Sequence, residues 1–341
     1  MENSLSFLRT FLALMMGLLS FISAPSASEE RPIVSKSDLK TWQLPEVSYP
    51  EANPYQKAVE NLGKQLFFDP RLTGDRTLSC AACHYPGTGW SDPLSNRNRE
   101  QRVMDRNTPA LINTAYLKRF FWDGRGITLE DSIKTHLREL SVKIADIPAL
   151  PTAYQQKFQF AFGSPEITPN NIARAIANFL RTIVVNDSPF DRWVAGDISA
   201  ISQSAKKGFL LFTGKARCVK CHTGPNFSDS QFHYTGINSL DPGHFDVTGN
   251  PRDRNRFRTA SLRQVSRTPP YMHNGAKNSL MDVIEFYSRG GDRHGEENEL
   301  NVLDLSEQDE RELLDFLMSL TGSNTSIAVP ELPLNDFPNS N

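Results

Sequence analysis

The chain has 341 residues, of which 38% are hydrophobic and 22% charged, and its formal net charge is −2. This composition is typical of a globular protein, and the length suits two domains of about 150 residues each. The 37 basic residues do not exceed the 39 acidic ones, which argues against a nucleic-acid-binding protein.

Residues 1–28 have the pattern of an export signal. Arg9 precedes an apolar segment, residues 11–22, and small residues follow it. Such a segment is too short to span a bilayer but matches the core of a signal peptide. We expect cleavage between Ala24 and Ser28 and export to the periplasm; an uncleaved membrane anchor is the alternative. No second apolar run follows, so we expect no membrane span in the mature chain.

The next segment, residues 29–50, is expected to be an extended leader. A segment with several apolar residues, Leu62 to Phe68, then precedes a Cys-x-x-Cys-His motif at residues 80–84. Further on, Thr168 is a helix N-cap residue and Pro169 suits the first helical position. Apolar residues follow at the spacing of one helix face. The first half therefore predicts a helix, a Cys-x-x-Cys-His motif, loops and a closing helix.

The second half repeats this order after a linker near residues 196–203. The apolar segment 208–212 precedes a second motif at residues 218–222. A closing helix is expected from Ser306, with Asp309 forming an approximate capping box and a glycine ending the helix. We expect an N-terminal domain over residues 51–200, a C-terminal domain over 201–325 and a surface tail over 326–341.

The cysteines indicate the chemistry. All four lie in the two motifs, which consist of Cys80, Cys83 and His84 and of Cys218, Cys221 and His222. Cys-x-x-Cys-His is typical of haem c attachment, because the two cysteines reach the two vinyl groups of one haem and the histidine lies under the iron. The pairs are too far apart for a zinc ribbon, and a thioredoxin-like motif needs no histidine. The sequence thus predicts two covalently bound haem c groups.

Few segments look like strands, and proline and glycine loops are common. With the repeated order of elements, this predicts a mainly α fold: two cytochrome c-like haem domains packed as a pseudo-repeat, with many loops.

Further blocks of sequence carry a resemblance to a known family. The blocks are Phe67 to Leu72, Arg106 to Leu111, Phe121 to Arg125, Ser188 to Arg192, Ser261 to Arg263 and Pro270 to Gly275. Together with the two motifs, from about Asn53 to Gly322, they resemble the bacterial di-haem cytochrome c peroxidases. They also resemble the MauG-like relatives of these enzymes, which build protein-derived tryptophan cofactors.

The resemblance implies roles for the two haems. The N-terminal haem, on His84, would react with hydrogen peroxide, and the C-terminal haem, on His222, would relay electrons. Trp122 matches the tryptophan that lies between the haems; without the resemblance, a core aromatic would be the plainer interpretation. Three further residues match those that bind a calcium ion between the haems in this family: Asn107, Thr268 and Pro270. Oxygen ligands of this kind suit calcium.

The loop after the first motif departs from the family pattern. Peroxidases of this family that need reductive activation carry a histidine there, which caps the N-terminal iron. Residues 85–108 contain no histidine. We therefore expect the sixth site of this iron to be open or occupied by water, with Met104 as the alternative ligand.

The distal ligand of the C-terminal haem also departs from the standard peroxidases. These have a methionine fourteen residues after the histidine of the Pro-Tyr-x-His block, and here that position is Tyr287, as in the MauG-like branch. An anionic phenolate lowers the potential of an iron, whereas a thioether raises it. The alternative is that Tyr287 only packs and that Met281 or Met272 binds the iron.

The acid–base group for peroxide cleavage is less clearly placed. The family has a glutamate about twenty residues after the inter-haem tryptophan, where this chain has Val142. Glu139 is the nearest glutamate before an apolar residue, and His136 is a rival or an assistant. The other histidines outside the motifs, His233, His244 and His294, are expected in solvated loops.

The resemblance favours an enzyme that reacts with hydrogen peroxide at the N-terminal haem. It would use the high-valent state to oxidise a secreted partner protein, with tryptophan as a candidate target, as MauG-like enzymes do. The alternative is a peroxidase that detoxifies peroxide with electrons from a small cytochrome or copper protein. A pure electron-transfer cytochrome is disfavoured, because it would need both irons closed to ligands.

Overall fold

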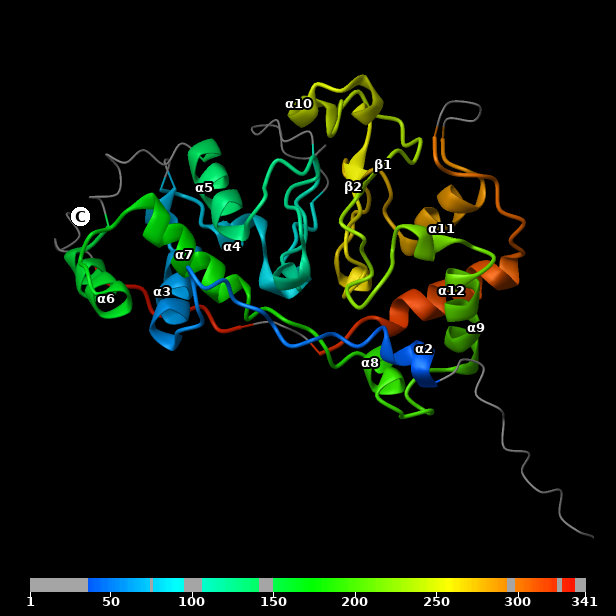
Figure 1. Cartoon of the computed structure of the whole chain (residues 1–341), viewed down its shortest axis with the longest axis horizontal. Coiled ribbons are helices and arrows are strands. Elements are labelled where there is room, and N and C mark those ends of the chain that lie inside the picture. The colour runs from blue at the N-terminus through cyan, green and yellow to red at the C-terminus, as the bar shows by residue number, and fades with distance from the viewer. Residues whose placement is uncertain are drawn as a thin grey trace, which may run out of the picture. The chain divides into compact units, whose positions relative to one another are not determined.

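The computed structural model describes residues 36–73, 76–94, 106–140, 150–292, 298–323 and 327–334. These residues belong to one compact unit that begins at Lys36, and the expected signal peptide and Met104 lie outside them. The described part is mainly helical (Figure 1), which confirms the expected fold class. Its one sheet pairs Phe232–His233 (β1) antiparallel with Phe257–Arg258 (β2). No described helix has the length and hydropathy to cross a membrane.

The N-terminal half has a helix before its motif, α3 (Lys57–Phe68), and a closing helix, α7 (Pro169–Leu180). The other described helices up to residue 200 are α4 (Cys80–Cys83), α5 (Leu129–Glu139), α6 (Thr152–Phe162) and α8 (Pro189–Val194), with short 3-10 helices η1 (Pro70–Leu72), η2 (Pro86–Thr88) and η4 (Thr114–Tyr116). Helix α8 packs on the core of the C-terminal half, where the ring centre of Phe190 lies 5.3 to 5.6 Å from those of Phe209, Phe227 and Phe316. The core between α3 and α7 is aliphatic and aromatic, and Leu66, Phe67 and Ile176 are among its buried side chains.

The C-terminal half, residues 201–325, repeats this plan. Its helices are α9 (Gln203–Thr213), α10 (Phe245–Thr248), α11 (Leu280–Ser288) and α12 (Glu307–Ser319), with η6 (Cys218–Lys220), η7 (Pro251–Asp253) and η8 (Val265–Arg267). Phenylalanines dominate its core: the ring of Phe316 is tilted against those of Phe209, Phe212 and Phe227, with ring centres 5.0 to 6.1 Å apart. Such pairs add to the burial of apolar area.

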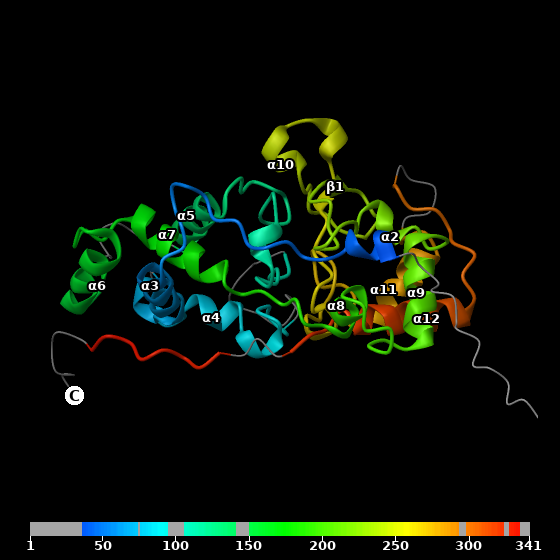
Figure 2. The ribbon, with the colours of Figure 1, turned by 60° about the horizontal axis from the view of Figure 1, so that its bottom comes forward.

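In each half, a glycine lets the helix before the motif cross the closing helix closely. A Cβ atom at Gly63 in α3 would lie 1.9 Å from the carbonyl oxygen of Ala175 in α7. A Cβ atom at Gly208 in α9 would lie 1.9 Å from the carbonyl oxygen of Glu312 in α12. Both crossings can be followed in Figures 1 and 2. No side chain fits at either point, so the two crossings depend on glycine.

The expected starts of the closing helices are confirmed. The Thr168 hydroxyl accepts a hydrogen bond from the backbone N–H of Asn171, and α7 begins at Pro169. Ser306 and Asp309 form a full capping box at the start of α12. Both signals are local, which is why the sequence alone reveals them.

A second repeat, with a constant offset of 151 positions, relates the segments that follow the motifs. The 3-10 helices η4 and η8 begin after residues 113 and 264, both in left-handed backbone conformation. Isolated antiparallel bridges join residues 120 and 126 and residues 271 and 277. Helices α5 and α11 begin after the capping residues Thr128 and Ser279. Equivalent positions in the two halves can therefore be compared residue by residue.

The leader differs from the expected extended segment. Lys36–Lys40 form a short helix, α2, and Trp42 is buried after it. The indole packs on Phe190, Phe209 and Phe227, with ring centres 4.9 to 6.5 Å apart. Burial of this large side chain anchors the segment, and no local sequence pattern signals it. The C-terminal tail is held on the N-terminal half by two hydrogen bonds. The side chain of Gln65 donates to the carbonyl of Glu331 at 2.8 Å, and that of Arg71 donates to the carbonyl of Pro333 at 2.9 Å.

Candidate functional site

The two Cys-x-x-Cys-His motifs form tight turns of the same kind. The N–H of His84 donates to the carbonyl of Cys80, and the N–H of His222 to that of Cys218, each at 2.9 Å. None of the four cysteines forms a disulfide bond with a described residue, and all are half-buried. Burial raises the pKa of Cys80 and of Cys218 to about 12, so neither thiol is a ready nucleophile or metal thiolate.

Both motif histidines are oriented by backbone carbonyl groups. The Nδ1 of His84 lies 3.3 Å from the carbonyl of Trp90, and the Nδ1 of His222 lies 3.0 Å from that of Phe227. Trp90 and Phe227 both have positive φ angles, 61° and 50°, so the chain bends back over each histidine. With Nδ1 as the donor to a carbonyl group, Nε2 is the nitrogen that would bind a metal in both rings, the usual arrangement of a metal-binding histidine.

A cavity of about 420 Å³ adjoins the second motif. Its walls include Cys218, Cys221 and His222, and Tyr287 from α11 lies on the same cavity. The rest of the lining is mostly apolar, with Leu280, Ile284, Leu313 and Leu317 among it. Burial above all raises the pKa of Tyr287 above its ordinary value. A volume of this order, with apolar walls and a few polar groups, suits a bound cofactor.

Arg258 supplies a charge that fits a haem propionate. It lines the cavity and is 4% exposed. Its guanidinium donates to the carbonyl groups of Phe121 and Thr259 at 3.0 and 2.9 Å. Burial lowers its pKa to about 10, and no described carboxylate pairs with it. Since a buried charge needs a counter-charge, the residues around the cavity fit a haem with its anionic propionates.

Trp122 lies on the same cavity and is held by hydrogen bonds. Its Nε1–H donates to the carbonyl of Asn107 at 2.7 Å, and its own carbonyl accepts from the N–H of Arg258 at 2.8 Å. Residue 273, its equivalent in the second repeat, is a histidine that stacks on Phe257 with ring centres 3.5 Å apart. The N–H of Asn107 donates to the carbonyl of His273 at 2.6 Å, so Asn107 joins the two equivalent positions.

The three residues expected at a calcium site lie together. Asn107, Thr268 and Pro270 all line the cavity, and the Asn107 amide nitrogen lies 2.5 Å from the Pro270 carbonyl oxygen. The Asn107 Oδ1 is buried and has no hydrogen-bond partner among the described residues. An orphaned oxygen beside a backbone carbonyl fits a hard cation.

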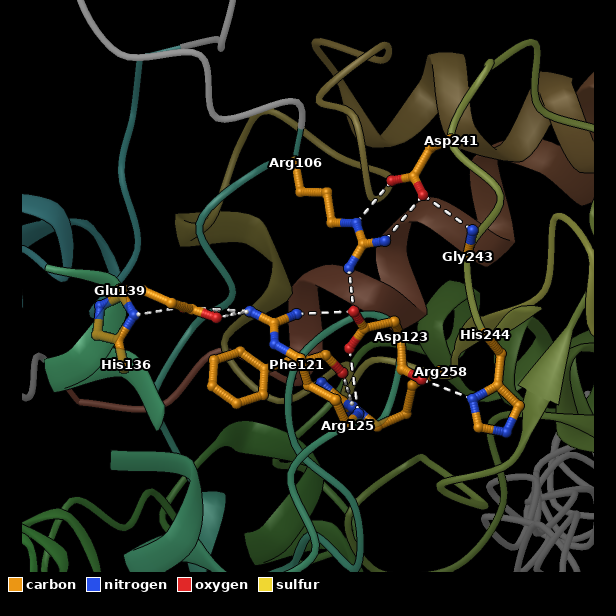
Figure 3. Close-up of polar contacts among 10 residues, drawn as sticks. All are labelled: Arg106, Phe121, Asp123, Arg125, His136, Glu139, Asp241, Gly243, His244 and Arg258. Carbon is orange, nitrogen blue, oxygen red and sulfur yellow. Dashed lines mark hydrogen bonds and ion pairs between the residues drawn. The ribbon is translucent and has the colours of Figure 1, made fainter. Parts of the chain in front are cut away.

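The expected acid–base residues lie at the end of α5, as Figure 3 shows. The Nδ1 of His136 lies 3.5 Å from a carboxylate oxygen of Glu139, and Arg125 donates to that carboxylate at 3.0 Å. The pKa of Glu139 is lowered, first by the hydrogen bond to His136 and, against the effect of burial, by the charge of Arg125. The ring centre of His136 lies 6.3 Å from that of His84.

This pair continues into a chain of ion pairs that joins the two halves (Figure 3). Arg125 contacts Asp123 at 2.7 Å, and Asp123 contacts Arg106 at 2.5 Å. Arg106 then reaches Asp241 in the C-terminal half at 2.6 Å. Burial alone would raise the pKa values of Asp123 and Asp241, but the arginines outweigh it and both pKa values are lowered.

Sequence reasoning missed several of these residues. The two ring nitrogens of His233, in β1, lie 2.8 Å from a carboxylate oxygen of Asp229 and 2.6 Å from one of Glu299, and the side chain is partly buried. His244 stacks on Phe232 with ring centres 3.6 Å apart. We expected both histidines in solvated loops, but the structure places neither there. Each has a partner that is distant in sequence. His294 lies outside the described residues. Arg258 carried no local signal, because only its buried surroundings distinguish it from a surface arginine.

Comparison with known proteins identifies the family of this chain. Residues 57–199 match the family model described as di-haem cytochrome c peroxidase. The methylamine utilization protein MauG of Methylorubrum extorquens is 39% identical over 300 residues, 84% of this chain and 85% of that protein. Cytochrome c551 peroxidase of Nitrosomonas europaea is 33% identical over 307 residues, covering 84% of this chain and 87% of the relative.

A solved structure extends the likeness to the fold. The crystal structure of a MauG-like protein associated with microbial copper homeostasis has a TM-score of 0.70 and 27% identity to this chain. The match covers 83% of this chain and 96% of that one. The family implies two haem c groups, and the two motifs and the cavity supply residues that fit them. The chain therefore belongs to the di-haem cytochrome c peroxidase family and is a haem oxidoreductase.

Proposed function

We propose that this enzyme uses hydrogen peroxide to oxidise a partner protein, as its resemblance to the MauG-like branch implies. The observation that carries the proposal is the position of Tyr287, which lies on the same cavity as Cys218, Cys221 and His222. A tyrosine at this place is the feature that separates the MauG-like branch from peroxidases with a methionine ligand. The relative with 39% identity is itself named MauG.

The roles of the haem-binding residues follow from this proposal. The two haems supply the iron at which peroxide is reduced and the redox centres that take electrons from the partner. Cys80 and Cys83 would attach the N-terminal haem, and His84 would bind its iron. In the C-terminal half the corresponding residues would be Cys218, Cys221 and His222. Tyr287 would be a second protein ligand of the C-terminal iron, and as a phenolate it would lower the reduction potential of that haem.

The overall reaction balances with a protein as the electron donor. One molecule of hydrogen peroxide takes up two electrons and two protons and gives two molecules of water. Both electrons come from the partner protein, with a tryptophan side chain as the candidate donor. Trp122 is assigned the electron path between the haems, because its indole lies on the cavity and is held in place by Asn107.

Glu139 and His136 are assigned the movement of protons. The lowered pKa of Glu139 keeps its carboxylate ionised, so that it can stabilise the positive charge that His136 gains when the imidazole takes up a proton. The contact with His136 provides a path by which the proton that leaves one peroxide oxygen reaches the other.

Calcium and export complete the proposal. Asn107 Oδ1, with the carbonyl oxygens of Thr268 and Pro270, would bind one calcium ion and fix the carbonyl that holds Trp122. Metal analysis of the purified protein should find one calcium per chain, and Asn107→Ala should lose it. Residues 1–28 would direct the chain to the periplasm, and the mass of the mature protein should reveal their removal.

The alternative function is peroxide detoxification with electrons from a small redox protein. The relative from Nitrosomonas europaea, at 33% identity, is named a cytochrome c551 peroxidase. If this function holds, steady-state turnover with peroxide and reduced cytochrome c should be fast.

One pair of assays separates the two functions. The holoenzyme is supplied with peroxide and either reduced cytochrome c or, as the candidate partner, any small exported protein that is encoded beside its gene. We expect slow cytochrome c turnover and added oxygen or lost hydrogen on a tryptophan of the partner, measured by mass spectrometry. Tyr287→Met should lose partner oxidation. Fast cytochrome c turnover without any change in the partner would favour detoxification instead.

A further inference from the structure

His136 and Tyr287 occupy equivalent positions of the two halves. They are 151 residues apart, the same offset that relates η4 to η8 and the capping residue of α5 to that of α11. Each lies on the eighth residue of its helix. In the C-terminal half this position lies on the cavity that His222 also borders. The repeat thus predicts that His136 faces the haem site of the N-terminal half.

The distance between the rings of His84 and His136 agrees with this prediction. Their centres lie 6.3 Å apart, with the planes at 74°. Two imidazoles on opposite faces of one metal ion have ring centres about 6 Å apart, because each metal–nitrogen bond is about 2 Å long. A histidine that acted through an iron-bound water or peroxide would lie at about 9 Å, since an oxygen and a hydrogen bond must fit between.

Among the described residues, the polar contact of His136 is made by its Nδ1, not by its Nε2. Its Nδ1 lies 3.5 Å from Glu139, which Arg125 holds in turn at 3.0 Å. Phe121 packs beside the imidazole with ring centres 6.4 Å apart. A carboxylate on Nδ1 orients an imidazole so that Nε2 binds a metal. His84 is oriented in the same way by the carbonyl of Trp90.

We propose that Nε2 of His136 binds the iron of the N-terminal haem on the face opposite His84, so that the resting enzyme is capped. The inference rests on the proposed function for the role of this haem. It replaces the expectation of an open sixth site, which considered only the loop at residues 85–108. Peroxide would then have to displace His136, whose imidazole would remain beside Glu139 and could accept a proton from peroxide.

Spectroscopy of the ferric holoprotein tests the cap without any turnover. We expect electronic absorption and EPR spectra of two low-spin haems. His136→Ala should convert one haem to high spin, and added imidazole should restore its low-spin spectrum. Cyanide should bind this haem about tenfold faster or more in the variant, because in the wild type only the uncapped fraction can react.

Controls separate the cap from general damage. His244→Ala removes a histidine outside the N-terminal haem site and should keep the wild-type spectra. His136→Gln serves as a second variant, and haem content is measured for each. Tyr287→Phe should alter the other haem and leave the low-spin signal of the capped one.

A high-spin ferric haem in the wild-type protein, unaffected by His136→Ala, would overturn the proposal. So would a low-spin signal that persists in both His136 variants with two haems bound. The partner assay is independent of these results. An uncapped enzyme that oxidises its partner refutes only the cap, and a capped enzyme that oxidises no partner refutes only the proposed function.

Discussion

The two halves of the molecule share one framework and differ at the equivalent positions that we propose face the haem sites. In both, a glycine allows two helices to cross, a motif histidine is oriented by a carbonyl group, and a capped helix follows at an offset of 151 residues. At equivalent places the N-terminal half has Trp122 and His136, and the C-terminal half has His273 and Tyr287. We propose that the repeated framework holds the cofactors and that these differing residues give the two haems their different roles.

The largest effect is expected when one half loses its attachment cysteines. Cys80→Ala with Cys83→Ala should leave one covalent haem and abolish the reaction with peroxide, because the remaining haem has no site for it. Intact mass after acid–acetone extraction counts the haems. The matched variant, Cys218→Ala with Cys221→Ala, should retain a haem that binds cyanide after His136 is removed. Free haem extracted from the wild type would contradict covalent attachment in both halves.

The glycine crossings test whether the halves depend equally on the shared framework. Gly63→Ala and Gly208→Ala should each destabilise the holoprotein by about 3 kcal/mol, because the new Cβ meets a backbone carbonyl that cannot move freely. Gly163→Ala is the control: nothing lies within 4 Å of its Cβ, so only its left-handed conformation costs about 1 kcal/mol. Urea unfolding measures the change. A wild-type midpoint for Gly63→Ala would mean that the crossing is loose.

The ion-pair chain tests how the halves are joined. Arg106→Met should destabilise the protein by about 2 kcal/mol near neutral pH, because Asp241 loses its partner at 2.6 Å. The pKa values of Asp123 and Asp241 are lowered in the folded chain. Their stabilisation is therefore present above the ordinary carboxyl pKa and is lost as the pH falls through the lower folded value, below about pH 4. An effect independent of pH would exclude this charge-based account.

The features of this arrangement that depend on neighbouring residues could be predicted from the sequence, and those that depend on residues far apart in the sequence could not. The haem motifs and the caps Thr168 and Ser306 are patterns of a few residues, so they could be predicted and the caps are confirmed. His136 and His84 are 52 positions apart in the sequence (136 − 84), and their rings come close only because of the way α5 packs. The buried charge of Arg258 depends likewise on tertiary structure. Neither has a local signature.

The most direct test of the account is the reduction potential of the C-terminal haem in Tyr287→Phe. Spectroelectrochemical titration follows each haem separately, and haem content confirms that both are bound. The account predicts a higher potential for the C-terminal haem, because an anionic oxygen ligand is lost, with the spectrum of the His136-capped haem unchanged and partner oxidation abolished. An unchanged potential, with a low-spin signal that Met281→Leu removes instead, would show that Tyr287 only packs and would contradict the division of roles between the two halves.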